Sequence, residues 1–151
     1  MKNRYRIILF ISLFLAISLS LTAQSSEEQT LIGTWVFDYE RSVAQMDTVA
    51  RKFFNKMSRI PRRISRFESR YKGRKLTFGS DRSYLLEFSD GNKIDATWSL
   101  KDKNKIVVKS SNNSSANYKI VVLTGNELII EIPPRRGQSS ALLSKYYYKK
   151  L

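Results

Sequence analysis

Hydrophobic and polar residues alternate along most of the chain from residue 75 onward. Seven short runs follow one another, separated by turn residues such as Asp90-Gly91 and Gly125-Asn126. Because side chains on a strand point alternately to its two faces, this period predicts antiparallel strands with one buried and one solvated face. The runs cover residues 75–79, 83–88, 93–100, 105–110, 117–124, 127–132 and 141–150.

An eighth strand is predicted near the start of the chain, over residues 31–40. Its alternate positions share one apolar face, formed by Leu31, Gly33, Trp35, Phe37 and Tyr39. Eight strands joined by short turns are enough for an up-and-down sheet to close into a barrel. The predicted fold is therefore mainly β, an eight-stranded antiparallel barrel. An open curved sheet wrapped around the intervening helix is the alternative.

The hydrophobic period changes between the first and second strands, where apolar residues recur every three or four positions. These positions are Val43, Met46, Ala50, Phe53, Met57, Ile60, Ile64, Phe67 and Tyr71. The spacing predicts one amphipathic helix over residues 43–71, beginning at a capping box on Ser42, kinked at Pro61 and stopped by Gly73. Two shorter helices meeting at Ile60 are the alternative. We expect the apolar stripe to pack on the sheet or on one barrel mouth.

The first 23 residues have the pattern of a secretory signal peptide. Lys2, Arg4 and Arg6 precede 15 uncharged residues, 7–21, and Ala23 follows. A membrane-spanning helix needs about 20 apolar residues, so a permanent anchor is the weaker alternative. We expect cleavage after Ala23, or after Ser20, and a protein that is periplasmic or secreted. Residues 24–30 then form a polar lead, and residues 31–151 form one domain.

The composition excludes several classes of chemistry. The 151 residues include no Cys and no His. Disulfides, lipoprotein acylation, thiolate or imidazole metal sites and histidine-dependent nucleophiles are therefore excluded. A hydrophobic content of 42% is that of a folded domain. We expect a monomeric, non-catalytic protein with no cofactor and no metal.

Positive charge is concentrated in one segment. The chain has 27 Lys and Arg against 13 Asp and Glu, a net charge of +14, and the loss of residues 1–23 would leave +11. Residues 51–75 contain eleven basic side chains and one acid, Glu68. Such a helix face suits an anionic envelope lipid or glycan, although a solvated face without a partner has the same pattern. The candidate anion-binding residues are Arg59, Arg62, Arg63, Arg66 and Arg70.

Nucleic acid is a disfavoured partner. Export would separate the protein from it, and the aromatic residues Phe53, Phe67 and Tyr71 lie on the apolar stripe of the helix. Side chains on that stripe are expected to pack in the core rather than to stack on bases.

Several short motifs together resemble the small secreted lipocalin-like domains of bacteria. They are Gly33-Thr34-Trp35, Asp90-Gly91, and residues 96–100, 118–124 and 127–130. The resemblance implies a calycin-type barrel in which a basic residue, here Lys149 or Lys150, covers the first-strand tryptophan. In a true lipocalin the main helix follows the last strand, whereas the helix predicted here follows the first.

The predicted barrel interior is rich in aromatic side chains. Candidates to line an apolar pocket are Trp35, Phe37, Phe78, Tyr84, Trp98 and Tyr118. Eight-stranded barrels either hold one small ligand or fill their interior with side chains. The leading hypothesis is a binding module for a small apolar ligand. The alternative is a cell-envelope interaction protein that works through the basic helix face.

Overall fold

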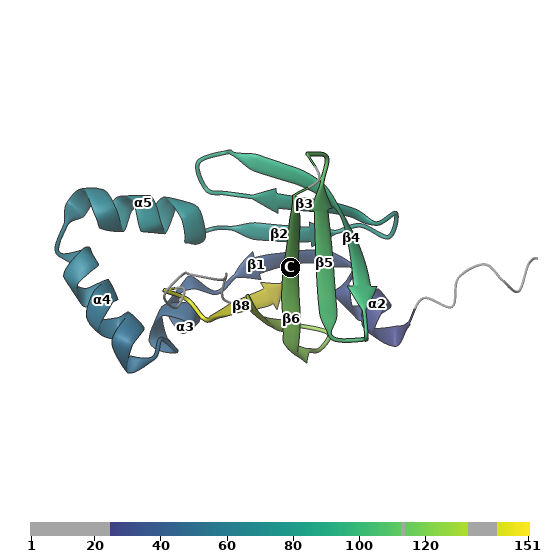
Figure 1. The fold of residues 1–151 in the computed structure, drawn as a ribbon, viewed down its shortest axis with the longest axis horizontal. Helices are drawn as coiled ribbons and strands as arrows, with labels where there is room; N and C mark the ends of the chain where they lie inside the picture. Colours follow the sequence, from purple (N-terminus) through teal and green to yellow (C-terminus); the bar gives the residue numbers. More distant parts are fainter. Residues whose placement is uncertain (1–24, 113, 133–141) are drawn as a thin grey trace, which may run out of the picture.

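Eight antiparallel strands form a closed barrel in the computed structural model, which describes residues 25–112, 114–132 and 142–151. Each strand pairs with the next along the chain, and the last pairs with the first from Trp35 opposite Lys150 to Phe37 opposite Tyr148 (Figure 1). The predicted barrel is confirmed, and the open-sheet alternative is wrong. The strands are β1 (Gly33–Phe37), β2 (Lys75–Phe78), β3 (Ser83–Glu87), β4 (Lys93–Lys101), β5 (Lys105–Ser110), β6 (Ser115–Leu123), β7 (Glu127–Glu131) and β8 (Lys145–Lys150).

A short helix, α2 (Ser26–Leu31), lies at one end of the barrel, which we call the closed end (Figure 1). The Oγ atom of Ser25 accepts a hydrogen bond from the Glu28 backbone N–H at 3.2 Å and so caps this helix. Part of the predicted polar lead is thus helical, and Leu31 ends this helix instead of starting β1. The predicted signal peptide lies outside the described residues.

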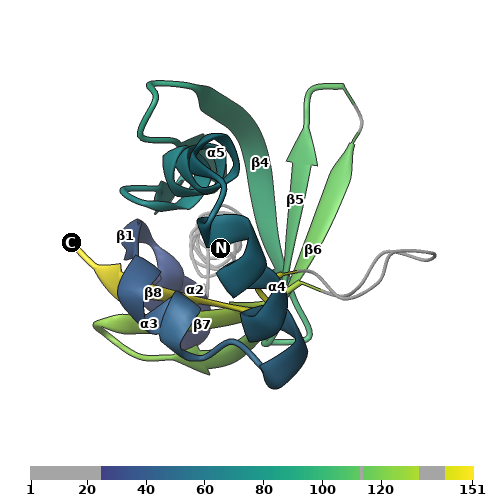
Figure 2. The same ribbon diagram turned by 90° about the vertical axis from the view of Figure 1, so that its left-hand side faces the viewer.

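Three helices replace the single kinked helix predicted over residues 43–71, which is not confirmed. They are α3 (Tyr39–Ala44), α4 (Thr48–Ser58) and α5 (Pro61–Tyr71). We call these three helices the helical arm, because they extend from the end of the barrel opposite α2 (Figures 1 and 2). We call that end of the barrel the mouth.

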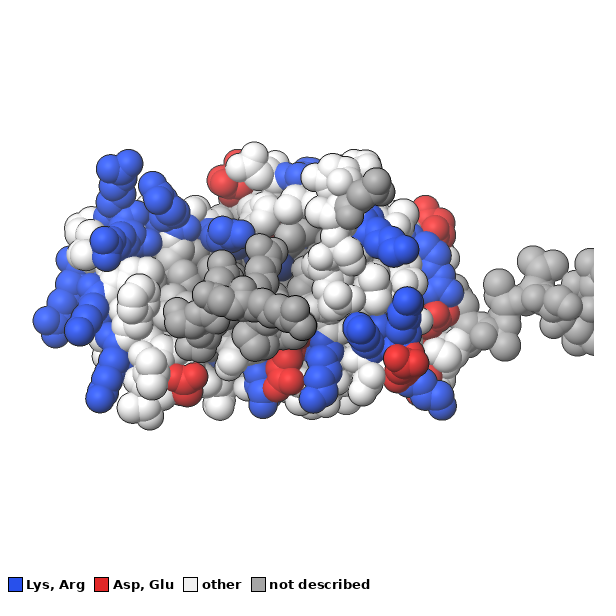
Figure 3. Space-filling view, in the orientation of Figure 1, with Lys and Arg blue, Asp and Glu red and all other residues white. Residues whose placement is uncertain are grey.

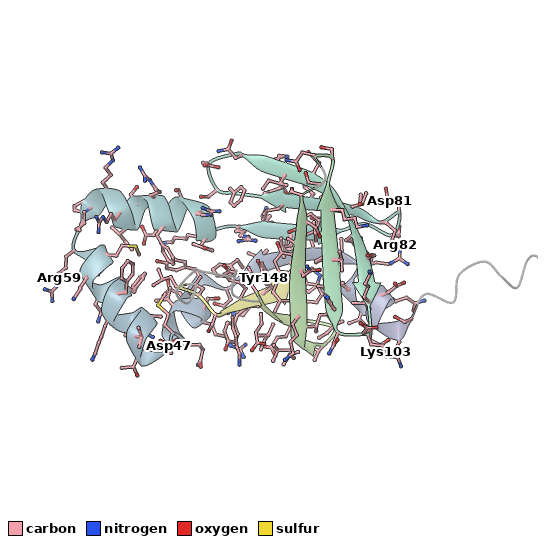
Figure 4. The ribbon with its side chains drawn as sticks, viewed as in Figure 1. Asp47, Arg59, Asp81, Arg82, Lys103 and Tyr148 are labelled. Carbon is pink, nitrogen blue, oxygen red and sulfur yellow. The ribbon has the colours of Figure 1, made fainter. Side chains whose placement is uncertain are left out.

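Local capping and proline chemistry explain the breaks in the arm. The Asp47 carboxylate accepts a hydrogen bond from the Ala50 N–H at 2.8 Å and starts α4 (Figure 4). Ile60 is extended because it precedes Pro61, which is the first residue of α5. The alternative of two helices meeting at Ile60 therefore describes α4 and α5 correctly.

The predicted capping box at Ser42 is wrong. Asp38 caps α3 by accepting a hydrogen bond from the Arg41 N–H at 3.1 Å. Ser42 lies inside this helix, and its buried hydroxyl accepts a hydrogen bond from the Tyr147 N–H of β8 at 3.2 Å. The Ser42 hydroxyl therefore joins α3 of the helical arm to β8 of the barrel.

The arm packs through a different set of residues than the continuous stripe predicts. Phe67 is buried, and its ring lies 5.5 Å from that of Phe54 and 4.7 Å from that of Tyr71. Phe53 is 58% exposed and Ile60 is 40% exposed, so the prediction that they pack in the core is wrong. The reason is that α4 starts anew at Thr48, which changes which of its faces points inward.

The barrel interior is filled by large side chains. The most deeply buried include Trp35, Phe78, Tyr148 and Leu128, whose exposed fractions are 0–1%. Among the described residues, no helix is both long and apolar enough to cross a membrane.

Candidate functional site

The six predicted interior residues lie together in the barrel. Five of them are buried, and Tyr118 is half-buried against the same core. The ring of Phe78 lies 5.5 Å from that of Tyr84 and 5.4 Å from that of Trp98. These are the contacts of a packed core, and ligand binding by the six side chains stays a prediction.

Lysine covers the first-strand tryptophan at the closed end. The Lys150 Nζ atom lies 5.0 Å from the centre of the Trp35 ring and donates a hydrogen bond to the Thr30 carbonyl at 2.8 Å. Gly33 has a φ of +127°, and a Cβ atom there would lie 2.9 Å from the Lys150 Cε atom. Glycine is therefore required where this lysine crosses β1, and the expectation of a covering lysine is confirmed for Lys150.

A groove of about 610 Å³ lies at the mouth, beside α5. Its lining combines apolar or aromatic side chains with the guanidinium groups of one helix. We call it the mouth groove; it is lined by Met57, Phe67, Tyr71, Leu142, Arg62, Arg63, Arg66 and Arg70. Pockets of a few hundred Å³ with apolar walls and a few charged groups are typical of small-molecule sites.

The structure brings four of the five predicted anion-binding arginines to this one groove. All five are exposed, and in the described part of the chain none forms an ion pair. Figure 3 shows one cluster of basic side chains over the helical arm and further basic side chains, mixed with acidic ones, over the barrel. Arg59 lies at the tip of the arm and points away from the barrel (Figure 4).

A second hollow, of about 520 Å³, lies along β5, β6 and β7. Its charged lining residues are Lys105, Lys119 and Glu131, and Lys119 is 3.7 Å from Glu131. Because its lining carries both signs of charge, this hollow lacks the electrostatic selectivity of the mouth groove.

Tyr71 links the mouth groove to the barrel interior. Its ring is stacked on that of Tyr146, with centroids 5.9 Å apart, and lies 5.7 Å from the ring of Phe37. The Arg74 guanidinium lies 6.0 Å from the Tyr71 ring and 5.5 Å from the Tyr146 ring. The floor of the groove is therefore continuous with an aromatic cluster inside the mouth.

Arg74 is the residue that sequence reasoning misplaced, by counting it with the basic helix face. The residue precedes β2 and is only 6% exposed, and its Nε atom has no hydrogen-bond partner among the described residues. In the same part of the chain, the buried hydroxyls of Tyr84 and Tyr148 also lack partners. A signal was available, because the two-residue period places Arg74 on the same face as Leu76 and Phe78.

The buried tyrosines keep their protons at neutral pH. Burial raises the pKa of Tyr84 well above its ordinary value of 10 and raises the pKa of Tyr148 to about 12. Both hydroxyls therefore remain hydrogen-bond donors at neutral pH.

Two carboxylates of the barrel form ion pairs with basic side chains. Asp38 lies 2.7 Å from Lys149, and Glu127 pairs with Arg41 of α3. Burial alone would raise the pKa of Asp38, but hydrogen bonds from Lys149 and the Arg41 N–H hold it below its usual value. These ion pairs help to join the arm to the barrel.

Residues 31–130 match the family model of the lipocalin-like domain. No curated protein and no solved structure shows a significant match to the chain. The matched segment extends from the last residue of α2 into β7, so it includes the helical arm as well as most of the barrel. Together with the closure of eight strands in sequence order, this match shows that the chain belongs to the family of lipocalin-like domains.

Proposed function

We propose that this protein is an exported, non-catalytic binding module that takes up a small amphipathic anion in the mouth groove. The groove itself is the observation that supports this proposal. Met57, Phe67 and Tyr71 offer an apolar surface to a hydrocarbon chain, and the four arginines on α5 offer a positive field to an acidic group. The packed interior favours binding at the mouth over binding in the centre of the barrel.

The binding proposal is tested by calorimetric titration with decanoate at low ionic strength. A variant with Arg62, Arg63, Arg66 and Arg70 changed to Gln is expected to bind about tenfold more weakly, because each exposed charge contributes a modest factor. The affinity of the wild type should fall as salt is added, because salt screens exposed charges.

A matched control removes the same number of charges from the barrel. Its substitutions are Lys101→Gln, Lys103→Gln, Lys105→Gln and Lys109→Gln, all at exposed positions. We expect this variant to keep the wild-type affinity within about threefold, because its charges lie outside the groove. Equal losses in the two variants would refute a local role for α5, and no decanoate binding by the wild type would refute the proposal itself.

Association with an anionic envelope lipid is the second candidate, and the outer face of α4 supports it. Val49 is 71% exposed on this helix, one turn before the exposed Phe53, and Lys52 and Lys56 lie beside them. Exposed apolar and basic side chains on one helix suit the surface of an anionic membrane. Co-sedimentation with phosphatidylglycerol vesicles, lost in a Val49→Ser/Phe53→Ser variant that still binds decanoate, would favour this candidate.

Export is tested separately by intact-mass measurement after expression of the full chain in a bacterium. The charged start and the uncharged run of residues 7–21 support cleavage after Ala23, so the recovered protein should begin at Gln24. We expect it in the soluble envelope or medium fraction. A species that retains residues 1–23 in the membrane pellet would contradict export by a cleaved signal.

A further inference from the structure

Arg74 is a buried cation without a counterion. In the described part of the chain, no carboxylate forms an ion pair with it, and its Nε atom lacks any hydrogen-bond partner. Arginine stays protonated in proteins, so the charge cannot be removed by titration. Burying an unpaired charge is costly, and such a group usually has a partner that satisfies it.

The side chains around Arg74 supply hydrogen-bond donors and aromatic faces but no negative charge. Its guanidinium lies over the rings of Phe88, Tyr146 and Tyr71 at 5.8, 5.5 and 6.0 Å. These distances are near the outer limit of about 6 Å for cation–π contacts and leave the Nε–H unsatisfied. The aromatic contacts alone therefore do not balance the charge.

Two more buried polar groups resemble Arg74 in this respect. Among the described residues, the buried hydroxyls of Tyr84 on β3 and Tyr148 on β8 have no hydrogen-bond partner. Phe37, which lies opposite Tyr148, donates its backbone N–H to the Arg74 carbonyl at 2.8 Å. Tyr84 lies opposite Phe78 on β2, the strand that Arg74 precedes. Figure 4 shows Tyr148 within the barrel. One guanidinium and two neutral hydroxyls would all be satisfied by a small group that accepts several hydrogen bonds and carries a negative charge.

We propose that Arg74, Tyr84 and Tyr148 form an anion-binding site inside the barrel mouth that holds the carboxylate of an amphipathic ligand. This inference rests on the proposed function, because the apolar body of the ligand would lie in the mouth groove. Tyr71 contacts both regions, and a carboxylate suits the planar fork of a guanidinium. The arginines of α5 then attract the anion, and Arg74 selects its head group.

The stability of the free protein gives the first test. We expect Arg74→Met to melt at or above the wild-type temperature, because replacing an unpaired buried charge with an apolar side chain of similar length removes a desolvation cost. The matched control is Arg82→Met. Arg82 makes two hydrogen bonds of 2.8 Å to the Glu28 carboxylate, so its loss should lower the melting temperature. A clear drop in melting temperature, or failure to fold, for Arg74→Met would overturn the proposal and assign the guanidinium a structural role.

Head-group selectivity gives the second test, by titration with decanoate and with decanol. The wild type should prefer decanoate by about a hundredfold, since both the α5 arginines and hydrogen bonds from a buried charged donor favour the carboxylate. Arg74→Met should lower this preference about tenfold and keep its decanol affinity, and Tyr148→Phe should lower the preference by a smaller factor. The Nε–H signal of Arg74 in a nitrogen-15 NMR spectrum is assigned as the one that is missing from Arg74→Met. Decanoate should shift this signal, whereas decanol should not.

The outcomes separate this inference from the function on which it rests. If Arg74→Met keeps the full preference for decanoate, the interior site is refuted, and the head group binds at the arginines of α5 as the proposed function alone requires. If the wild type binds neither decanoate nor decanol, both proposals are refuted together.

Discussion

Replacing Trp35 with alanine is expected to lower the free energy of unfolding by about 3–5 kcal/mol. The side chain is fully buried at the closed end, and its Nε1–H donates a hydrogen bond of 2.8 Å to the Leu31 carbonyl. Its loss removes a large apolar contact and leaves the Leu31 carbonyl, at the end of α2, without this hydrogen-bond donor. It also removes the aromatic ring that Lys150 covers. These contacts join β1, β8 and α2, so the whole closed end should weaken.

Denaturant unfolding measures this effect, with Trp98 as the remaining fluorescent probe. The matched control is Ile94→Ala on β4, because Ile94 is 43% exposed and its loss should change stability by about 0.5 kcal/mol or less. A cost for Trp35→Ala below about 1 kcal/mol would mean that the closed end is not part of the cooperative core.

Two aromatic positions of the helical arm, one on α4 and one on α5, should differ sharply in their effect on stability. Phe67→Ala is expected to cost about 3–5 kcal/mol, whereas Phe53→Ala should cost about 0.5 kcal/mol or less. The Phe67 ring is buried against Phe54 and Tyr71, whereas the Phe53 ring is 58% exposed. The continuous helix predicted from the sequence would bury Phe53. It would therefore require Phe53→Ala to lower the free energy of unfolding by a similarly large amount.

Circular dichroism and tryptophan fluorescence distinguish loss of the arm from loss of the barrel. Both tryptophans lie in the barrel, whereas the arm contributes most of the helix. We expect the two signals to unfold together in the wild type, because Tyr71 packs on Phe37 and Tyr146. Equal effects of Phe53→Ala and Phe67→Ala would contradict the observed helix break at residues 45–47.

The candidate site was only partly visible in the sequence. The arginines of α5 could be identified because a dense run of positive charge on a helix is a local property. The apolar floor that completes the mouth groove combines Met57 of α4, residues of α5 and Leu142 just before β8, which only tertiary folding brings together. Arg74 was grouped with the exposed basic residues because arginine is seldom buried, although its position in the alternation indicated an inward side chain.

The sequence by itself determined the number and order of the strands and the class of the fold. Side-chain alternation and turn residues depend on neighbouring positions, so they can be read along the chain. The tertiary structure alone decided which face of α4 is buried, which lysine covers Trp35 and where Arg74 points. These features depend on where barrel closure places the ends of β1, β2 and β8, which are far apart in the sequence, and no local pattern encodes such long-range contacts.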